Sequence, residues 1–458
     1  MKDKTKVTFI QLPHVIFPPT KQEKRFFGAL WKRQKAIFPN LKEPSWTEPW
    51  ENLYWVQYLA GVIRDVADCE LVDLYFMNGE EVDPYKAARY VIEKAESNIY
   101  LVSPLTQNFD LSLKVCGQIK KLNHEFKIIA GGIHLDRTQH CDKNFESFDI
   151  ILTGHCEGFL KEVLQNIHNI PIPYKAHSFY DCYFSKTLPD YSFNMENKIM
   201  RVYTTDVCAN ACAFCVNSNV SFGYTPVYKK VSQVINEIET LKKQSPTSTL
   251  FLADSTFLQR PKQTLPLLRE LIGTGYKWMC QTRLDCLTPE IVQLLKEAGC
   301  NYIEIGFETA DQKILNTLNK GTKIKQFEEV LRLLEDANIP VMTFWMLGLP
   351  GETKELFNRT VETMCAFLES GLCFLVDPMQ LVPHPGSAIY NNPKKFGIEI
   401  TSRNFELYRE NYKPVYRTKF FSEEEMYENY LFCLEQCTKA MEGGNETSSS
   451  YLSTRSIG

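Results

Sequence analysis

Short apolar runs that end at turn residues alternate with helix-like segments along most of this chain of 458 residues. This alternation is typical of βαβ units, in which a helix carries the chain from one parallel strand to the next. With 44% apolar residues the chain is long enough for two or three domains, each with a core of its own. The sequence therefore predicts a folded α/β protein.

The first part of the chain, residues 1–170, is predicted to form a Rossmann-like, doubly wound parallel sheet. Its expected strands are residues 7–12, 70–76, 98–104, 126–132 and 148–154. Helix-like segments such as 85–97 and 111–124 lie between them. Ligands of such a sheet bind beyond the carboxyl ends of its strands. The aromatic, proline-broken stretch 18–55 predicts a large loop.

A linker at residues 171–195 leads to a second alternating region at residues 196–390. The strands expected there are residues 199–205, 248–254, 277–283, 302–308, 340–348 and 373–382. This pattern predicts a partial (β/α)6 TIM barrel, which carries its chemistry on loops at the C-terminal strand ends. A C-terminal helical segment is expected at residues 391–440, followed by a flexible tail at 441–458.

Composition excludes several classes of partner. The formal net charge is −4, with 51 Lys and Arg against 55 Asp and Glu, so no basic field indicates nucleic acid or an anionic membrane. The sequence contains no run of about 18 apolar residues, so we expect no segment that inserts into a membrane. Its start does not have the layout of a signal peptide. We therefore expect a cytoplasmic protein whose 15 cysteines are reduced thiols or metal ligands.

Cys208, Cys212 and Cys215 form a C-x3-C-x2-C pattern directly after the first strand of the predicted barrel. Soft thiolates suit zinc or an iron–sulfur cluster. A structural zinc site needs a fourth ligand and usually contains paired C-x2-C units, and no second such pair occurs. Three cysteine ligands would leave one iron of a cubane open to a small molecule. Buried or zinc-bound cysteines are the alternative.

With Phe214 before the last cysteine, this loop resembles the signature of the radical S-adenosylmethionine (SAM) family. The resemblance implies a [4Fe-4S] cluster on the three cysteines. It also implies SAM as a cofactor, bound to the open iron through its amino and carboxylate groups. In that family an electron from the cluster cleaves SAM to a 5′-deoxyadenosyl radical.

Later strand ends of the predicted barrel extend the resemblance. The stretches LADSTF, QTRLD and GFET contribute Asp254, Arg283 and Glu308, which by resemblance would orient SAM. Ion pairs at the barrel mouth are the alternative for these three residues. The turns GLPGET (348–353) and VPHPGSAIY (382–390) resemble those of the subgroup with an N-terminal cobalamin-binding domain. Within the first turn, Glu352 is expected to cap a helix.

Three loops of the N-terminal sheet resemble loops of that cobalamin-binding domain: residues 103–110, 130–136 and 153–158. The resemblance implies cobalamin contacts from Ser103, Leu105, Thr106, Gly131, Gly132 and Gly154. The chain contains no D-x-H-x-x-G motif, so the usual lower axial histidine is absent. The family's G-E-G-E turn is here Gly154-His155-Cys156-Glu157. A domain that keeps the fold without cobalamin is the alternative.

The resemblance covers about residues 5–390 and implies a cobalamin-dependent radical SAM enzyme. By analogy it would methylate an unactivated carbon of a small-molecule or peptide substrate, with an external electron donor such as flavodoxin or ferredoxin. One alternative is a radical SAM cyclase or rearrangement enzyme without methyl transfer, and another is a non-catalytic, metal-stabilised binding protein. The motifs identify no residue that acts on the substrate itself. Cys433 and Cys437, four apart on an expected helix, are predicted to be buried free thiols.

Overall fold

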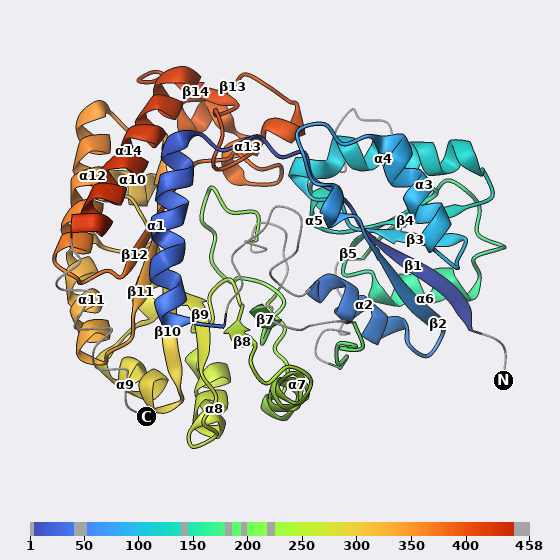
Figure 1. The fold of residues 1–458 in the computed structure, drawn as a ribbon, viewed down its shortest axis with the longest axis horizontal. Helices are drawn as coiled ribbons and strands as arrows, with labels where there is room; N and C mark the ends of the chain where they lie inside the picture. The colour runs from blue at the N-terminus through green and yellow to red at the C-terminus, as the bar shows by residue number, and fades with distance from the viewer. Residues whose placement is uncertain are drawn as a thin grey trace. The chain divides into compact units, whose positions relative to one another are not determined.

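The computed structural model describes residues 4–40, 53–138, 145–178, 186–193, 199–217 and 225–443. The chain divides into two compact units, traced in Figure 1. Unit 1 consists of Met1–Pro18, Pro44–Glu196 and Asn404–Tyr408, and unit 2 of Pro19–Glu43, Asn197–Arg403 and Arg409–Gly458. The chain therefore passes between the units more than once.

Unit 1 is built on a parallel sheet of six strands in the order β2-β1-β3-β4-β5-β6. The strands are β1 (Thr5–Gln11), β2 (Ala67–Asp73), β3 (Ile99–Val102), β4 (Lys127–Ala130), β5 (Ile150–Gly154) and β6 (Tyr174–Ser178). The first five lie at or near the predicted positions, and four of them are largely buried apolar runs, whereas β2 is only partly buried. β6 lies in the stretch that we expected to be a linker. It pairs with β5 at the sheet edge and is not buried, so its sequence YKAHS carries no apolar signal.

Helices cover both faces of this sheet, as a doubly wound fold requires (Figure 1). α3 packs against α4, and α2 packs against α6. The helices of unit 1 are α2 (Tyr54–Ile63), α3 (Pro84–Lys94), α4 (Phe109–Leu122), α5 (Ile133–Arg137) and α6 (Glu157–Gln165). This arrangement leaves the carboxyl ends of β3, β4 and β5 together at one edge.

Unit 2 contains a second parallel sheet, whose order β12-β11-β10-β9-β8-β7 is also the order of the strands along the chain. The strands are β7 (Ile199–Val202), β8 (Thr249–Leu252), β9 (Trp278–Thr282), β10 (Cys300–Glu308), β11 (Val341–Leu347) and β12 (Leu375–Gln380). Among the described residues, β7 and β12 do not pair, so the strands form an open arc. The predicted partial barrel is confirmed.

Helices follow the strands of this arc: α7 (Val231–Gln244), α8 (Pro261–Leu271), α9 (Pro289–Glu297), α10 (Gln312–Thr317), α11 (Phe327–Asp336) and α12 (Lys354–Glu369). An aromatic layer fixes the helices to the sheet. The ring centroid of Phe307 lies 4.1 Å from that of Phe327 and 5.5 Å from that of Trp345. Trp345 and Phe307 are fully buried, so these contacts remove large apolar surfaces from water.

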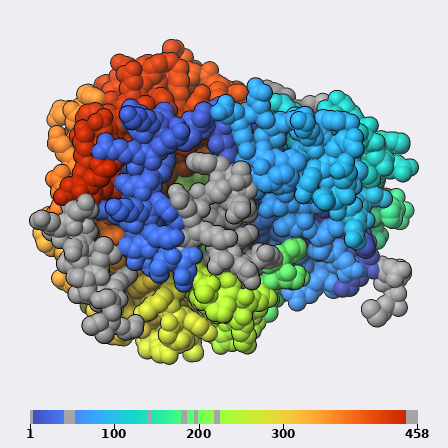
Figure 2. Space-filling view, viewed as in Figure 1, coloured from blue at the N-terminus to red at the C-terminus, as the bar shows by residue number. Residues whose placement is uncertain are grey.

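The prediction of a loop over residues 18–55 is wrong in its first half, because α1 (Lys21–Ile37) lies there. Thr20 and Glu23 form a capping box: the Thr20 hydroxyl accepts from the Glu23 backbone, and the Glu23 carboxylate accepts from the Thr20 backbone. Arg33 donates to the carbonyl oxygens of Phe374 and Met441, at 3.0 and 2.5 Å. α1 therefore belongs to unit 2, where it lies against α14 (Figure 2).

The C-terminal segment is only partly helical. Residues 391–422, expected to be helical, contain an antiparallel pair of short strands, β13 (Ile398–Ile400) and β14 (Tyr416–Thr418), after the short helix α13 (Ala388–Asn391). One long helix follows, α14 (Glu423–Gly443), and the rest of the predicted tail lies outside the described residues. On α14, Cys433 and Cys437 are fully buried with their Sγ atoms 4.0 Å apart.

The state of the cysteines and the apolar character of the helices are both predicted from the sequence. The cysteines in the described part of the chain are free thiols, as expected for a protein without disulfides. Within the same residues, no helix is both long and apolar enough to cross a membrane.

Candidate active site

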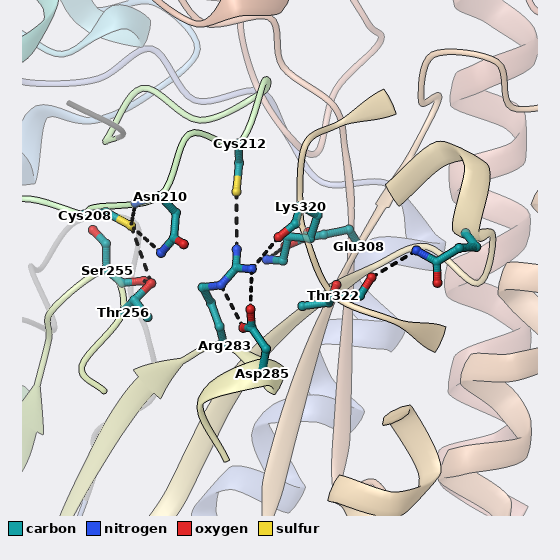
Figure 3. Close-up of polar contacts among 11 residues, drawn as sticks. Cys208, Asn210, Cys212, Ser255, Thr256, Arg283, Asp285, Glu308, Lys320 and Thr322 are labelled. Atoms are coloured by element: carbon teal, nitrogen blue, oxygen red, sulfur yellow. Dashed lines mark hydrogen bonds and ion pairs between the residues drawn. The ribbon is translucent and has the colours of Figure 1, made fainter. Parts of the chain in front are cut away.

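The three predicted metal ligands lie on one loop that follows the end of β7, at the carboxyl side of the unit 2 sheet. Figure 3 shows two of them, Cys208 and Cys212. Cys208 is buried, and its Sγ lies 3.6 Å from the hydroxyl oxygen of Thr256. Asn210 donates to the same sulfur from its side-chain amide at 3.3 Å and from its backbone at 3.5 Å. The backbone of Cys215 donates to the carbonyl of Cys212 at 3.1 Å, which turns the loop between them.

Asp254 fixes the start of this loop. Its carboxylate accepts hydrogen bonds from the backbone N–H groups of Thr204 and Thr205, at 2.6 and 3.1 Å, and from the Thr204 hydroxyl. Burial raises the pKa of Asp254 to about 6, although these hydrogen bonds favour the charged form. Both carboxylate oxygens are occupied by the entry to the cysteine loop. These contacts favour a role in positioning that loop over the predicted contact with SAM.

Two side chains that the sequence motifs did not single out hold the loop backbone. The amide of Gln259 accepts from Ala209 N–H at 2.6 Å and donates to the Val207 carbonyl at 2.9 Å. Asn319 donates to the Ala211 carbonyl at 2.9 Å. Amides in loops are common, so no sequence signal marks these two. The result is a cysteine loop pinned from the β8 side and from the α10 side.

Arg283, at the end of β9, is buried against the loop. Its guanidinium donates to both carboxylate oxygens of Asp285, each at 2.9 Å, and to the backbone carbonyl of Lys320. The remaining Nη1 lies 3.6 Å from the Sγ of Cys212 (Figure 3). A guanidinium held in this way is a rigid, permanent positive charge beside a candidate cluster ligand.

Glu308, at the end of β10, forms a buried ion pair with Lys320, with 2.5 Å between Oε1 and Nζ. Both side chains are 7% exposed. Glu308 has a φ of 70°, in the left-handed region that favours glycine. The Lys320 ammonium also lies 6.0 Å from the ring centroid of Phe214. The structure therefore brings Arg283 and Glu308 to the cysteine loop, to which Phe214 itself belongs, and adds Lys320, which the sequence motifs did not single out.

The donors fit an iron–sulfur cluster in their chemistry. Burial raises the pKa of the Cys212 thiol and raises that of Cys215 to about 12, whereas the charges of Lys320 and Arg283 act against the shift at Cys212. Cys208 is buried and the other two cysteines are partly buried, so three thiolates here need cations or a metal nearby. In the part of the chain that the structure describes, no three His, Cys, Asp or Glu side chains are close enough to hold a single ion.

A cavity of about 220 Å³ opens in unit 1 at the carboxyl ends of β3, β4 and β5. Four of the six residues predicted to contact cobalamin line it: Ser103, Gly131, Gly132 and Gly154. The other lining residues are Trp55, Tyr58, Leu59, Leu101, Val102, Ile129, Ala130, Leu152, Cys156, Glu157 and Leu160. The cavity is therefore mostly apolar, as is usual for a cofactor pocket.

Backbone constraints explain two of these glycines. Gly154 has a φ of 71°, and a Cβ there would overlap the carbonyl oxygen of Ser178 on β6. Gly132 has a φ of 100°, and a Cβ there would overlap the hydroxyl of Ser103. The remaining predicted contacts do not line the cavity. Leu105 is exposed, and the Thr106 hydroxyl lies 3.1 Å from Nδ1 of His134.

The GLPGET turn differs from our prediction. The residue that caps α12 is Thr353, whose hydroxyl accepts from Leu356 N–H. Glu352 is instead buried, and its Oε2 accepts from the Gly348 backbone at 2.7 Å. Burial raises the pKa of Glu352 to about 8. The Tyr416 hydroxyl donates to the Gly348 carbonyl at 2.8 Å, so both sides of this turn are held by side chains.

Comparison with known proteins assigns the domain that carries the cysteine loop. Residues 202–364 match the model of the Radical SAM superfamily. The chain is 23% identical over 319 residues to a bacteriochlorophyllide d C-12(1)-methyltransferase of Chlorobaculum tepidum, covering 66% of this chain and 67% of that protein. It is 32% identical over 157 residues to an anaerobic magnesium-protoporphyrin IX monomethyl ester cyclase of Rubrivivax gelatinosus, covering 33% and 28% respectively.

The fold of the chain is similar to that of solved structures. The radical SAM methyltransferase TsrM of Kitasatospora setae, solved with cobalamin and a [4Fe-4S] cluster, matches with a TM-score of 0.64 at 14% identity. That match covers 94% of this chain and 89% of TsrM, so the likeness of fold extends over both units. Residues 202–364, which carry the three-cysteine loop, thus match the Radical SAM superfamily, and the chain as a whole has a fold similar to that of TsrM.

Proposed function

We propose that this chain is a cobalamin-dependent radical SAM methyltransferase that acts on an unactivated carbon of a small molecule. The observation that carries the proposal is the loop of three cysteines beside Arg283 and the buried Glu308–Lys320 pair. The glycine-bordered cavity of unit 1 supports a second cofactor. The relation to a bacteriochlorophyllide methyltransferase and the TsrM fold support methyl transfer.

Cys208, Cys212 and Cys215 would hold the [4Fe-4S] cluster. When bound, the cluster and SAM supply a 5′-deoxyadenosyl radical, and cobalamin supplies a carrier for the methyl group. Arg283 keeps a charged Nη1 directed toward the cluster ligand Cys212, a position from which it can also pair with a carboxylate. Asp254 would act indirectly, because its carboxylate holds the backbone that leads into the cysteine loop.

Glu308 would orient SAM through its free oxygen. Its Oε1 is paired with Lys320, and Oε2 has no hydrogen-bond partner among the described residues. A carboxylate oxygen accepts from an ammonium group or from a ribose hydroxyl. Phe214, next to Cys215 and under the Lys320 ammonium, supplies an apolar surface against which a ring can pack.

Cobalamin would be held by unit 1. Ser103, Gly131, Gly132 and Gly154 border the cavity, where the absence of side chains lets a ligand approach the backbone. The cavity of about 220 Å³ suits one heteroaromatic group rather than a whole corrin ring. We therefore assign it to the nucleotide end of the cofactor. Leu105 and Thr106, outside the cavity, stay predictions as contacts.

The test is anaerobic purification with added hydroxocobalamin, followed by quantification of iron, sulfide and cobalt. We expect about four irons and absorbance near ~400 nm in the wild-type protein, together with cobalt. Cys215→Ala should lose most of the iron. Gly154→Ala should lose cobalt and keep iron, because the added Cβ overlaps the Ser178 carbonyl and must displace the backbone that borders the cavity.

Gly273→Ala is the matched control, since Gly273 also has a positive φ but nothing lies within 4 Å of its Cβ position. It should retain both metals. A wild-type protein without iron would contradict the whole proposal. Iron without cobalt in the wild-type protein would contradict only the cobalamin part, and would leave a radical SAM enzyme with a cofactor-free first domain.

A cyclase or rearrangement enzyme is the second candidate, favoured by the match to the magnesium-protoporphyrin IX monomethyl ester cyclase. Product analysis separates the two functions. Methyl transfer of this kind yields S-adenosylhomocysteine alongside 5′-deoxyadenosine, whereas the second candidate yields 5′-deoxyadenosine alone. An external donor such as flavodoxin or ferredoxin, a peptide as the substrate and a cytoplasmic location stay predictions.

A further inference from the structure

Lys320 is a buried cation at the mouth of the barrel that no motif accounts for. It follows α10 and is 6% exposed, with its ammonium 2.5 Å from Oε1 of Glu308. Burying an ion pair costs solvation that the attraction between its charges only partly returns. Hydrophobic side chains of similar volume would stabilise the fold at least as well. The position of this charge therefore points to a role other than stability.

The backbone at Glu308 and next to Lys320 adopts unusual conformations that position the ion pair. Glu308 and Asn319 adopt φ values of 70° and 53°, which residues other than glycine rarely take. A Cβ at Gly306 would overlap both ends of the ion pair, Oε1 of Glu308 and Nζ of Lys320. The ends of β10 and α10 thus both depart from regular structure at this point.

The same lysine is in contact with the cysteine loop. Its carbonyl accepts from the Arg283 guanidinium, whose Nη1 lies 3.6 Å from Cys212 Sγ (Figure 3). Its ammonium lies 6.0 Å from the Phe214 ring centroid. The ammonium end of the ion pair is therefore the end that contacts the cysteine loop.

We infer that Lys320 is a positioning residue that places a positive charge beside the cysteine loop and so raises the reduction potential of the cluster. The inference rests on the proposed function, since it requires a cluster on these cysteines. Reduction adds an electron to the cluster, and a nearby cation stabilises the added negative charge. A low dielectric environment strengthens this effect.

The experiment is a potentiometric titration of the reconstituted cluster, followed by electron paramagnetic resonance. Lys320→Met should lower the midpoint potential, because it leaves the Glu308 carboxylate uncompensated near the cluster. Lys320→Arg should stay near the wild-type value. Glu308→Gln should shift the potential upward, and the double variant Lys320→Met/Glu308→Gln should return toward the wild type. Lys323→Met, three residues away and exposed, is the matched control and should not change the potential.

The opposite signs of the two single variants separate charge from structural damage, which would shift both potentials in one direction. Equal potentials in Lys320→Met and Lys323→Met, or equal shifts in Lys320→Met and Lys320→Arg, would overturn the inference while the cluster assignment stands. If Lys320→Met takes up no iron, the potentials of Glu308→Gln and of the double variant show whether the charge of Lys320 raises the midpoint potential. A wild-type protein that forms no cluster overturns both the inference and the proposed function.

Discussion

Two buried carboxyl groups in unit 2 differ in the hydrogen bonds that stabilise their charged form. Asp254 accepts from two backbone N–H groups and one hydroxyl, and its pKa is raised by burial to about 6. The Glu352 side chain accepts from backbone N–H groups only, chiefly that of Gly348 at 2.7 Å, and its pKa is raised by burial to about 8. Hydrogen bonds to the charged form lower a pKa, so the group with fewer of them keeps its proton to a higher pH.

Glu352 therefore makes stability depend on pH. The folded protein keeps the proton up to pH about 8, whereas an unfolded glutamate loses it near its ordinary pKa of 4.5. Between these values the folded state binds more protons, so the free energy of unfolding falls as pH rises, by at most about 1.4 kcal/mol for each pH unit. We expect Glu352→Gln to be less sensitive to pH than the wild type between pH 5 and 8, measured by urea unfolding.

Glu355→Gln is the control for this prediction, because the Glu355 side chain is 82% exposed. It should follow the wild-type pH profile. A Glu352→Gln profile parallel to the wild type would show that this carboxyl group is charged in the folded protein at neutral pH.

Among the secondary-structure elements, α1 shows how a helix can lie in a stretch whose composition indicates a loop. Prolines and aromatic residues before and after it obscure the pattern, and its apolar face packs on α14 rather than on a neighbour in sequence. Its start is nevertheless encoded locally by Thr20 and Glu23. β6 is the corresponding case among the strands, since pairing with β5 defines it.

The capping box of α1 gives a prediction at this scale. Thr20→Ala removes the hydroxyl that accepts from Glu23 N–H and should lower the free energy of unfolding by about 1 kcal/mol. Thr20→Ser keeps the hydroxyl and should lose much less. Chemical unfolding of the two variants under the same conditions measures the difference. Equal stability of Thr20→Ala and the wild type would mean that the packing of α1 alone determines where it begins.

At the scale of the whole molecule, the chain returns to unit 1 after the barrel is complete. Residues Asn404–Tyr408 belong to unit 1, although the residues before and after them belong to unit 2. The Phe405 ring centroid lies 5.0 Å from that of His134 and 6.2 Å from that of Phe109. The N-terminal unit therefore depends on a segment that the chain reaches only after residue 400.

Phe405→Ala tests this dependence. Phe405 is 2% exposed, so its truncation should destabilise unit 1 by about 3–5 kcal/mol. Hydrogen exchange should accelerate in α4 of unit 1 and stay unchanged in α11 of unit 2. Phe420→Ala, at a residue that is 39% exposed, is the control and should leave both rates unchanged. Equal acceleration in both helices would contradict the division into two units.

The sequence by itself determined the alternating strands and the position of the cysteine loop. Eleven predicted strands are found near their expected residues, because a buried parallel strand is a short apolar run whatever its neighbours are. The spacing of Cys208, Cys212 and Cys215 is likewise a local property. The resemblance to a known family also indicated Phe214, which lies in that loop, and Arg283 and Glu308, which the structure brings to it.

Only the tertiary structure decided what each side chain does there. Asp254 holds the loop through Thr204 and Thr205, 50 and 49 residues earlier in the chain, and Glu352 proved to be a buried acid rather than a helix cap. Lys320 has no motif of its own, and it became a candidate only because folding pairs it with Glu308 and brings its ammonium to Phe214 of the cysteine loop. Such roles depend on contacts between residues distant in sequence, which local patterns do not contain.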